Sequence, residues 1–178
     1  MATPDFVLAL REKIGTAPLW LSGVTAVVIR PSSRHVAGGP TTGEETHEVL
    51  PAELPEVLLV KRADNGAWTP VTGIIDPGEE PAVAAAREVL EEADIVAVPE
   101  RLIWVHTTAP VIYGNGDRSQ FLSLVFRFSY VSGEPSPADG ENTEARWYRA
   151  DALPPMSERM ARSVALALAN DPQAVFES

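Results

Sequence analysis

Apolar positions along the chain follow two spacings, and the changes from one to the other divide it into helices and strands. Runs or alternations of Val, Ile and Leu predict strands, whereas apolar residues three and four apart predict amphipathic helices. Clusters of Gly, Pro and Asn separate these segments. The predicted helices cover residues 4–14, 82–93 and 156–169, and the predicted strands cover residues 24–29, 57–60, 101–108, 120–131 and 144–149.

This order of elements predicts an α/β fold, in which helices lie on the faces of a mixed sheet. Residues 1–20 are predicted to form a helical extension at the N-terminus, and residues 31–55 a long polar loop between two strands. Residues 113–118 are rich in turn-forming residues and predict a hairpin connection. Neither flank of the long loop is a self-sufficient core, so residues 1–178 are predicted to be a single domain.

The segment 82–93 is the clearest helix. Pro81 suits the first helical position, and the run that follows contains no Gly and is rich in Ala, Leu and Glu. At about 100° per residue, its apolar positions share one broad face, which is predicted to face the core. The residues of this face are Val83, Ala86, Val89, Leu90 and Ala93.

Three carboxylates lie on the other side of the same helix. Glu88 is three residues before Glu91 and four before Glu92, so the three side chains are neighbours. Like charges at these spacings cost roughly 0.2–0.5 kcal/mol per pair. Arg87 offsets only part of that repulsion, and a hard divalent cation such as Mg²⁺ would suit the cluster. The alternative is an ordinary solvated helix face.

The spacing of the charged residues separates these two alternatives. Gly73 is followed after five residues by Glu79, and after seven more by Arg87-Glu88; Glu91-Glu92 and Asp94 come next. This pattern resembles the Nudix box, the signature of Nudix hydrolases. That family usually has Gly where this chain has Asp94, which we interpret as a helix C-cap in the left-handed conformation.

The resemblance extends beyond the box. Residues 68–73, 144–147 and 153–154 also look like the neighbours of a Nudix box, so the likeness covers residues 20–170 in outline. It implies an α/β/α sandwich with a mixed sheet. It also implies that Glu88 and Glu92 bind a metal, Mg²⁺ or Mn²⁺, that Glu91 is a ligand or a base, and that the carbonyl of Gly73 is a further ligand.

Other candidate residues lie outside the metal set. The resemblance implies that Arg87 and Glu79 form an ion pair that shapes the loop of the box. Glu144 and Glu141, beside Glu91, are candidates for the base that activates water; the alternative for both is a solvated carboxylate on a loop. The candidates for holding a nucleotide by stacking or phosphate contact are Arg62, Trp68 and Tyr113, although Trp68 equally suits the core.

Composition narrows the classes of partner. The net charge of −11 argues against duplex nucleic acid, because binding to a phosphate backbone needs a basic face. The chain contains no Cys, which excludes disulfides and thiolate metal sites and fits a reducing cytoplasm. No apolar run approaches 18 residues, and the N-terminus lacks signal-peptide architecture, so no membrane association is predicted. A homodimer is an open alternative to a monomer.

Two functions from different classes follow. The first is a metal-dependent hydrolase that cleaves a diphosphate linkage in a nucleoside diphosphate joined to another moiety, such as a nucleotide sugar, ADP-ribose or a nucleoside triphosphate. The second is a catalytically silent Nudix-fold module that binds and senses a nucleotide. The intact acidic cluster favours the enzyme. An isomerase of allylic diphosphates shares the fold, but the family resemblance would call for a catalytic Cys.

Overall fold

A computed structural model describes residues 3–32, 54–138 and 140–177. The predicted loop 31–55 therefore lies mostly outside the described residues. The helices are α1 (Asp5–Ile14), α2 (Pro81–Ala93) and α3 (Glu158–Ala169). The strands are β1 (Leu19–Arg30), β2 (Glu56–Arg62), β3 (Trp68–Thr69), β4 (Val71–Ile74), β5 (Val96–Thr107), β6 (Val111–Ile112), β7 (Arg118–Ser132), β8 (Asn142–Arg149) and β9 (Val175–Phe176).

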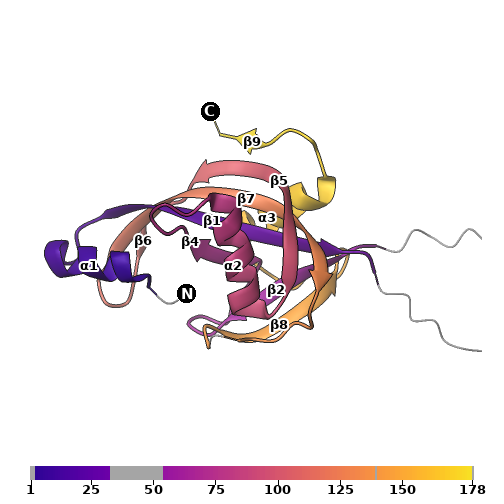
Figure 1. Cartoon of the computed structure of the whole chain (residues 1–178), viewed down its shortest axis with the longest axis horizontal. Coiled ribbons are helices and arrows are strands. Elements are labelled where there is room, and N and C mark those ends of the chain that lie inside the picture. The colour runs from indigo at the N-terminus through magenta and orange to yellow at the C-terminus, as the bar shows by residue number, and fades with distance from the viewer. Residues whose placement is uncertain (1–2, 33–53, 139, 178) are drawn as a thin grey trace, which may run out of the picture.

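The described strands form one mixed nine-stranded sheet, whose main path runs β3-β2-β1-β7-β5-β9. Strand β1 pairs in parallel with β7 and antiparallel with β2 and β4, while β8 pairs antiparallel with β2. Helices α2 and α3 cover opposite faces of this sheet (Figure 1). The predicted sandwich with a mixed sheet is therefore confirmed.

Each face of the sheet has its own hydrophobic core. Between α2 and the sheet, Val89 packs with small helix residues and with Phe128 of β7. Between α3 and the sheet, Val164 packs against Val27 of β1 and Trp104 of β5. Side chains of one strand alternate between the two cores, so strand register decides which side chains reach α2.

The predicted core face of α2 is wrong in part. Val83 and Leu90 are 58% and 49% exposed, whereas Glu88 and Glu92 are only 7% and 4% exposed. The helix packs closely against the sheet through the small residues Ala84 and Ala85, which are completely buried. This close approach turns the line of Glu88 and Glu92 towards the sheet and leaves the larger apolar side chains in solvent.

The N-terminal helix lies where the sequence predicts it, but the strand that follows begins earlier than predicted. The predicted helical extension 1–20 contains a helix that ends at Ile14, and β1 begins at Leu19, five residues before the predicted start of that strand. Parallel pairing with β7, which starts at Leu19 opposite Ser119, accounts for this extra length. Among the described residues, no helix is long and apolar enough to cross a membrane.

One arginine joins α1 to the hairpin of β6 and β7. Arg11 donates to the carbonyl oxygen of Arg118 at 2.7 Å and to the hydroxyl of Ser119 at 3.2 Å. It also donates to the carbonyl oxygen of Ala17 at 2.6 Å, beyond the end of its own helix. This hairpin carries Tyr113, whose backbone N–H donates to the carbonyl oxygen of Asp117 at its turn. The N-terminal helix therefore helps to fix the hairpin.

Helix α2 ends at Asp94 in the left-handed conformation that the sequence predicts. Its φ and ψ are 55° and 35°, and its N–H donates to the carbonyl oxygen of Leu90 at 3.0 Å. The unusual residue of the box is thus a helix cap, which explains how the motif accepts Asp at this position.

Replacing Asp94 by Gly should raise the free energy of unfolding slightly, by about 0.5 kcal/mol. Relief of left-handed strain, roughly 1–2 kcal/mol, exceeds the added entropy of the unfolded chain, roughly 0.4–1 kcal/mol. Urea unfolding measures the change. Asn170→Gly is the matched control, because Asn170 caps α3 with the same φ of 55°. A lower unfolding free energy for Asp94→Gly, with Asn170→Gly stabilised, contradicts this account.

Candidate active site

Glu88 lies directly against the backbone of Gly73 in β4. A Cβ atom added at Gly73 would stand 2.2 Å from both Cγ and Cδ of Glu88, so no other residue fits there without moving the carboxylate. The neighbouring strand is also close to this backbone, since a Cβ added at Gly23 of β1 would lie 3.3 Å from the carbonyl oxygen of Gly73. The structure therefore brings together Gly73 and Glu88, two of the predicted metal ligands.

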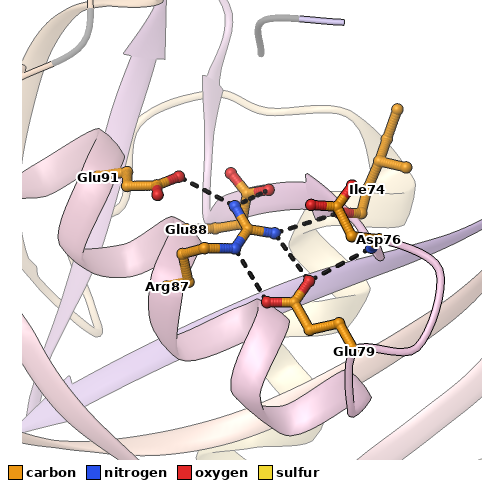
Figure 2. A network of polar contacts seen from close by, with 6 residues as sticks. All are labelled: Ile74, Asp76, Glu79, Arg87, Glu88 and Glu91. Carbon is orange, nitrogen blue, oxygen red and sulfur yellow. Dashed lines mark hydrogen bonds and ion pairs between the residues drawn. The ribbon is translucent and has the colours of Figure 1, made fainter. Parts of the chain in front are cut away.

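Arg87 is the centre of a network of acidic partners (Figure 2). Its Nε and Nη2 donate to the two carboxylate oxygens of Glu79 at 2.9 and 3.0 Å, which is the predicted ion pair of the box. Its Nη1 donates to Glu88 at 3.1 Å and to Glu91 at 2.9 Å. Its Nη2 also donates to the carbonyl oxygen of Ile74 at 3.4 Å. One guanidinium thus links the loop after β4 to two of the three clustered carboxylates.

Glu92 lies one helical turn beyond Glu88 and is buried against the first residue of β8. The side-chain amide of Asn142 donates to Oε2 of Glu92 at 3.0 Å, and both side chains are buried. Glu91, in contrast, faces solvent with a half-exposed side chain. The three carboxylates of α2 therefore differ in surroundings: two are buried against strands and one is open to water.

Two predicted substrate-binding residues lie around the same carboxylates. Arg62 ends β2 as the pairing partner of Asn142, and Asp64 binds its guanidinium through contacts of 2.9 and 2.7 Å. The bonded Asp64 raises the pKa of Arg62, and the charges of Glu92 and Tyr113 raise it further. Arg62 is thus close enough to Glu92 and to Tyr113 of the hairpin to interact with both electrostatically.

Two other predicted residues lie on the opposite side of the sheet. Trp68 packs into the core under α3, where its ring meets Tyr148 edge-on at 5.1 Å. Glu144 accepts from Lys61, the residue paired with Trp68, at 3.0 Å, and it also contacts Arg146. Lys61 holds the pKa of Glu144 below its ordinary value. The structure does not bring these two residues together with the α2 carboxylates.

Glu141, the other predicted base on the late loop, is next in sequence to a residue that contacts the α2 carboxylates. It directly precedes Asn142, and its carbonyl oxygen accepts from the N–H of Ala63, just after β2. Asn142 itself was not among the predicted residues. Its contact with Glu92 spans 50 positions, and no periodicity in the sequence indicates it.

Burial dominates the electrostatics of Glu88. Loss of solvent raises the pKa of its carboxyl from 4.5 to about 7, and the neighbouring Arg87 opposes that rise. The bonded Arg87 lowers the pKa of Glu79 instead, because that carboxylate receives two charge-assisted hydrogen bonds. Because Glu88 is buried, a positive partner stabilises its ionised form.

The oxygen donors fit a small divalent cation. Glu88 and Glu92 are buried carboxylates one turn apart, and the Gly73 backbone lies beside the first. In residues 3–32, 54–138 and 140–177, no three acidic or histidine side chains are assembled closely enough to hold an ion. Mg²⁺ commonly takes one or two carboxylates, water and substrate phosphates, so a complete protein cage is unnecessary.

Comparison with known proteins agrees with this geometry. The sequence model of the NUDIX domain matches residues 44–167. A MutT-like protein of Streptomyces ambofaciens is 34% identical over 120 residues, 67% of this chain and 70% of that protein. The chain therefore belongs to the Nudix family, and its class is that of the Nudix-type pyrophosphohydrolases.

Two further relatives are longer proteins. The human 8-oxo-dGDP phosphatase NUDT18 is 33% identical over 60% of this chain, and the NAD-capped RNA hydrolase NudC of Pseudomonas aeruginosa is 32% identical over 66%. These matches cover only 32% and 39% of the respective relatives. Their similarity to this chain is therefore limited to part of each protein.

Solved structures show the same fold at low sequence identity. An ADP-ribose pyrophosphatase of Streptococcus suis has a TM-score of 0.57 at 16% identity, covering 88% of this chain and 96% of that chain. A UDP-X diphosphatase has a TM-score of 0.58 at 16% identity, covering 99% of this chain and 75% of that chain. Both confirm the architecture that the sequence predicts.

The metal-free protein should lose stability as the pH rises from 4.5 towards 7. Glu88 binds its proton more tightly in the folded state, so its contribution is complete below pH 4.5 and is lost on ionisation near pH 7. The loss is at most about 3 kcal/mol. Urea unfolding in EDTA between pH 4.5 and 8 measures the slope.

Two variants isolate the contribution of Glu88. Glu88→Gln removes the ionisation and should flatten the curve relative to the wild type. Glu91→Gln, which changes a half-exposed carboxylate on the same helix, should keep the slope. Parallel wild-type and Glu88→Gln curves would show that burial of Glu88 does not control the pH dependence.

Proposed function

We propose that this chain hydrolyses a diphosphate linkage in a nucleoside diphosphate joined to another moiety, with Mg²⁺ or Mn²⁺ and by attack of water at phosphorus. The observation that carries this proposal is the burial of Glu88 and Glu92, one turn apart on the box helix. Burying two acidic side chains is costly, and a bound cation would add to the compensation that Arg87 and Asn142 provide.

Glu88, Glu92 and the Gly73 carbonyl would hold the cation, with Glu91 as a further ligand or base. The bound cation supplies Lewis-acid neutralisation of charge on the phosphate oxygens. Nudix hydrolases in general use divalent metal ions, which supports this assignment. Arg87 keeps the carboxylates close to one another, while its two bonds to Glu79 fix the loop that follows β4.

The base that activates water is assigned among the carboxylates next to the buried pair. Glu91 is open to solvent and lies on the box helix, and Glu141 directly precedes Asn142, so both suit a water molecule at this edge of α2. Glu144 is the weaker candidate. The hydrogen bond from Lys61 lowers the pKa of the Glu144 carboxyl, which makes it a weaker proton acceptor. In addition, Glu144 faces the α3 side of the sheet.

Arg62 and Tyr113 would contact the substrate on the other side of the carboxylates. Arg62 carries a charge suited to phosphate, and Asp64 holds its guanidinium in one orientation. Tyr113 is 45% exposed and presents an aromatic ring at the tip of the hairpin. Trp68 would support these residues from the core rather than stack on a nucleotide, because it packs beneath α3.

Relatives support the substrate class only in outline. Their names include a phosphatase of an oxidised nucleoside diphosphate, a hydrolase of NAD-capped RNA and an ADP-ribose pyrophosphatase. All three substrates contain phosphates attached to a nucleoside. A small nucleotide derivative is therefore proposed, while a cytoplasmic location, a homodimer and the absence of duplex nucleic acid stay predictions.

Turnover should require a divalent cation. The purified chain is treated with EDTA, and a panel of nucleoside triphosphates, nucleotide sugars, ADP-ribose and dinucleoside polyphosphates is tested with and without Mg²⁺. Phosphate-containing products are expected from one class and only with metal. Turnover that is undiminished after metal removal contradicts the mechanism. Metal-dependent binding without hydrolysis would instead assign the chain to the silent, nucleotide-sensing class.

Glu92→Gln should reduce turnover by at least 100-fold and leave the fold intact. The change removes a ligand charge and relieves repulsion along α2, so the melting temperature in EDTA should stay equal or rise. Glu80→Gln is the matched control, because Glu80 is an exposed residue at the start of the same helix. Near-normal turnover in Glu92→Gln removes Glu92 from the site, whereas gross loss of stability makes it structural.

A further inference from the structure

We propose that Asn142 is a positioning residue, which orients the carboxylate of Glu92 for the divalent cation. The proposal rests on the proposed function. Its basis is the hydrogen bond of 3.0 Å from Nδ2 of Asn142 to Oε2 of Glu92, between side chains that are 6% and 4% exposed. The amide fixes the position of one carboxylate oxygen of Glu92 and thereby the orientation of the whole carboxylate.

An irregularity in strand pairing brings Asn142 to the correct side of the sheet. Lys61 pairs with Glu144, but the next residue of β2, Arg62, pairs with Asn142, so Thr143 is an extra residue in β8. Such a bulge reverses the alternation of side chains along a strand. Ala145 packs into the α2 core, and regular alternation from it would direct Asn142 towards α3. With the bulge, Asn142 reaches α2.

The polar residues of β2 and β8 on either side of this bulge face opposite sides of the sheet. Glu144 lies with Lys61 on the α3 side, whereas Asn142 and its partner Arg62 lie near Glu92. Because of the bulge, Arg62 is paired with Asn142 and not with Thr143, so the strand residue beside Glu92 is a neutral amide donor. A neutral amide does not add to the repulsion among the acidic residues of α2, so it suits a role in orientation.

Hydrogen bonds of this kind commonly matter for metal affinity. A partner that orients a ligating side chain fixes its geometry, and its loss typically weakens metal binding or activity by roughly 10–100-fold. Asn142→Leu keeps a similar side-chain size but removes the donor. The metal-free variant should therefore bind Mn²⁺ with a dissociation constant roughly 10–100-fold higher than that of the wild type.

The experiment is a titration of Mn²⁺ into the metal-free proteins without nucleotide, followed by electron paramagnetic resonance of the free ion. Circular dichroism in EDTA checks that each variant is folded, and Asn142→Ala replaces Asn142→Leu if the larger side chain prevents folding. The matched control is Thr143→Val, which removes the bond of 3.3 Å from Thr143 to the carbonyl oxygen of Lys61 in the same bulge.

The expected result is weaker Mn²⁺ binding in the Asn142 variants and wild-type binding in Thr143→Val. In turnover assays, high Mg²⁺ should restore much of the activity of Asn142→Leu, which a general structural defect would not allow. Wild-type Mn²⁺ affinity in the Asn142 variants overturns this inference alone. Equal losses in Thr143→Val and Asn142→Leu also overturn it, because the bulge and not the amide would then matter. A wild-type protein that binds no Mn²⁺ overturns the metal-dependent reaction as well.

Discussion

The close contact between α2 and the sheet is the constraint on which the site depends. Two completely buried alanines bring the helix near β4, and Gly73 leaves the space in which the side chain of Glu88 lies. A bulkier residue at any of these positions would lift the helix or displace the carboxylate. Packing of small residues thus determines how deeply the acidic side chains are held, and their depth in turn determines their electrostatics.

The chain compensates for this burial with partners from several elements. Arg87 contributes from the helix itself and Asn142 from a distant strand, while Glu79 in the preceding loop holds Arg87 in place. The last turn of α2 contains no basic residue, although the helix dipole favours positive charge there. Local helix stability is therefore reduced where the site is built, and contacts with the sheet provide the stability that the helix alone lacks.

Much of the architecture could be predicted from spacing, because spacing reports periodicity and fixed motifs directly. The start of α2 at Pro81, the left-handed Asp94 and the pairing of Arg87 with Glu79 all follow from local sequence. The orientation of α2 does not follow from local sequence, because apolar character alone predicts the wrong buried face. In this helix, Val83 faces solvent while Glu92 is buried, since contact distance and not hydrophobicity determines the packing.

Long-range features were the least predictable part of the site. Trp68 and Glu144 read as plausible site residues because they are close in sequence to Nudix-like segments, yet strand register turns both towards α3. Asn142 faces α2 only because Thr143 is an extra residue in β8. Such a one-residue shift leaves no trace in the pattern of polar and apolar positions.

The pairing of β1 with β7 also has a consequence for how the protein acquires its site. Residues about 100 positions apart form this parallel ladder, and Glu92 meets its amide partner across 50 positions. Non-local contacts of this kind slow folding, because chain entropy is lost before the contacts form. During synthesis, the box helix emerges well before β7 and β8. Its acidic side chains therefore lack their partners on these strands until the strands have been made. A nascent chain that ends before β8 therefore contains the whole Nudix motif but lacks the strand that completes its surroundings.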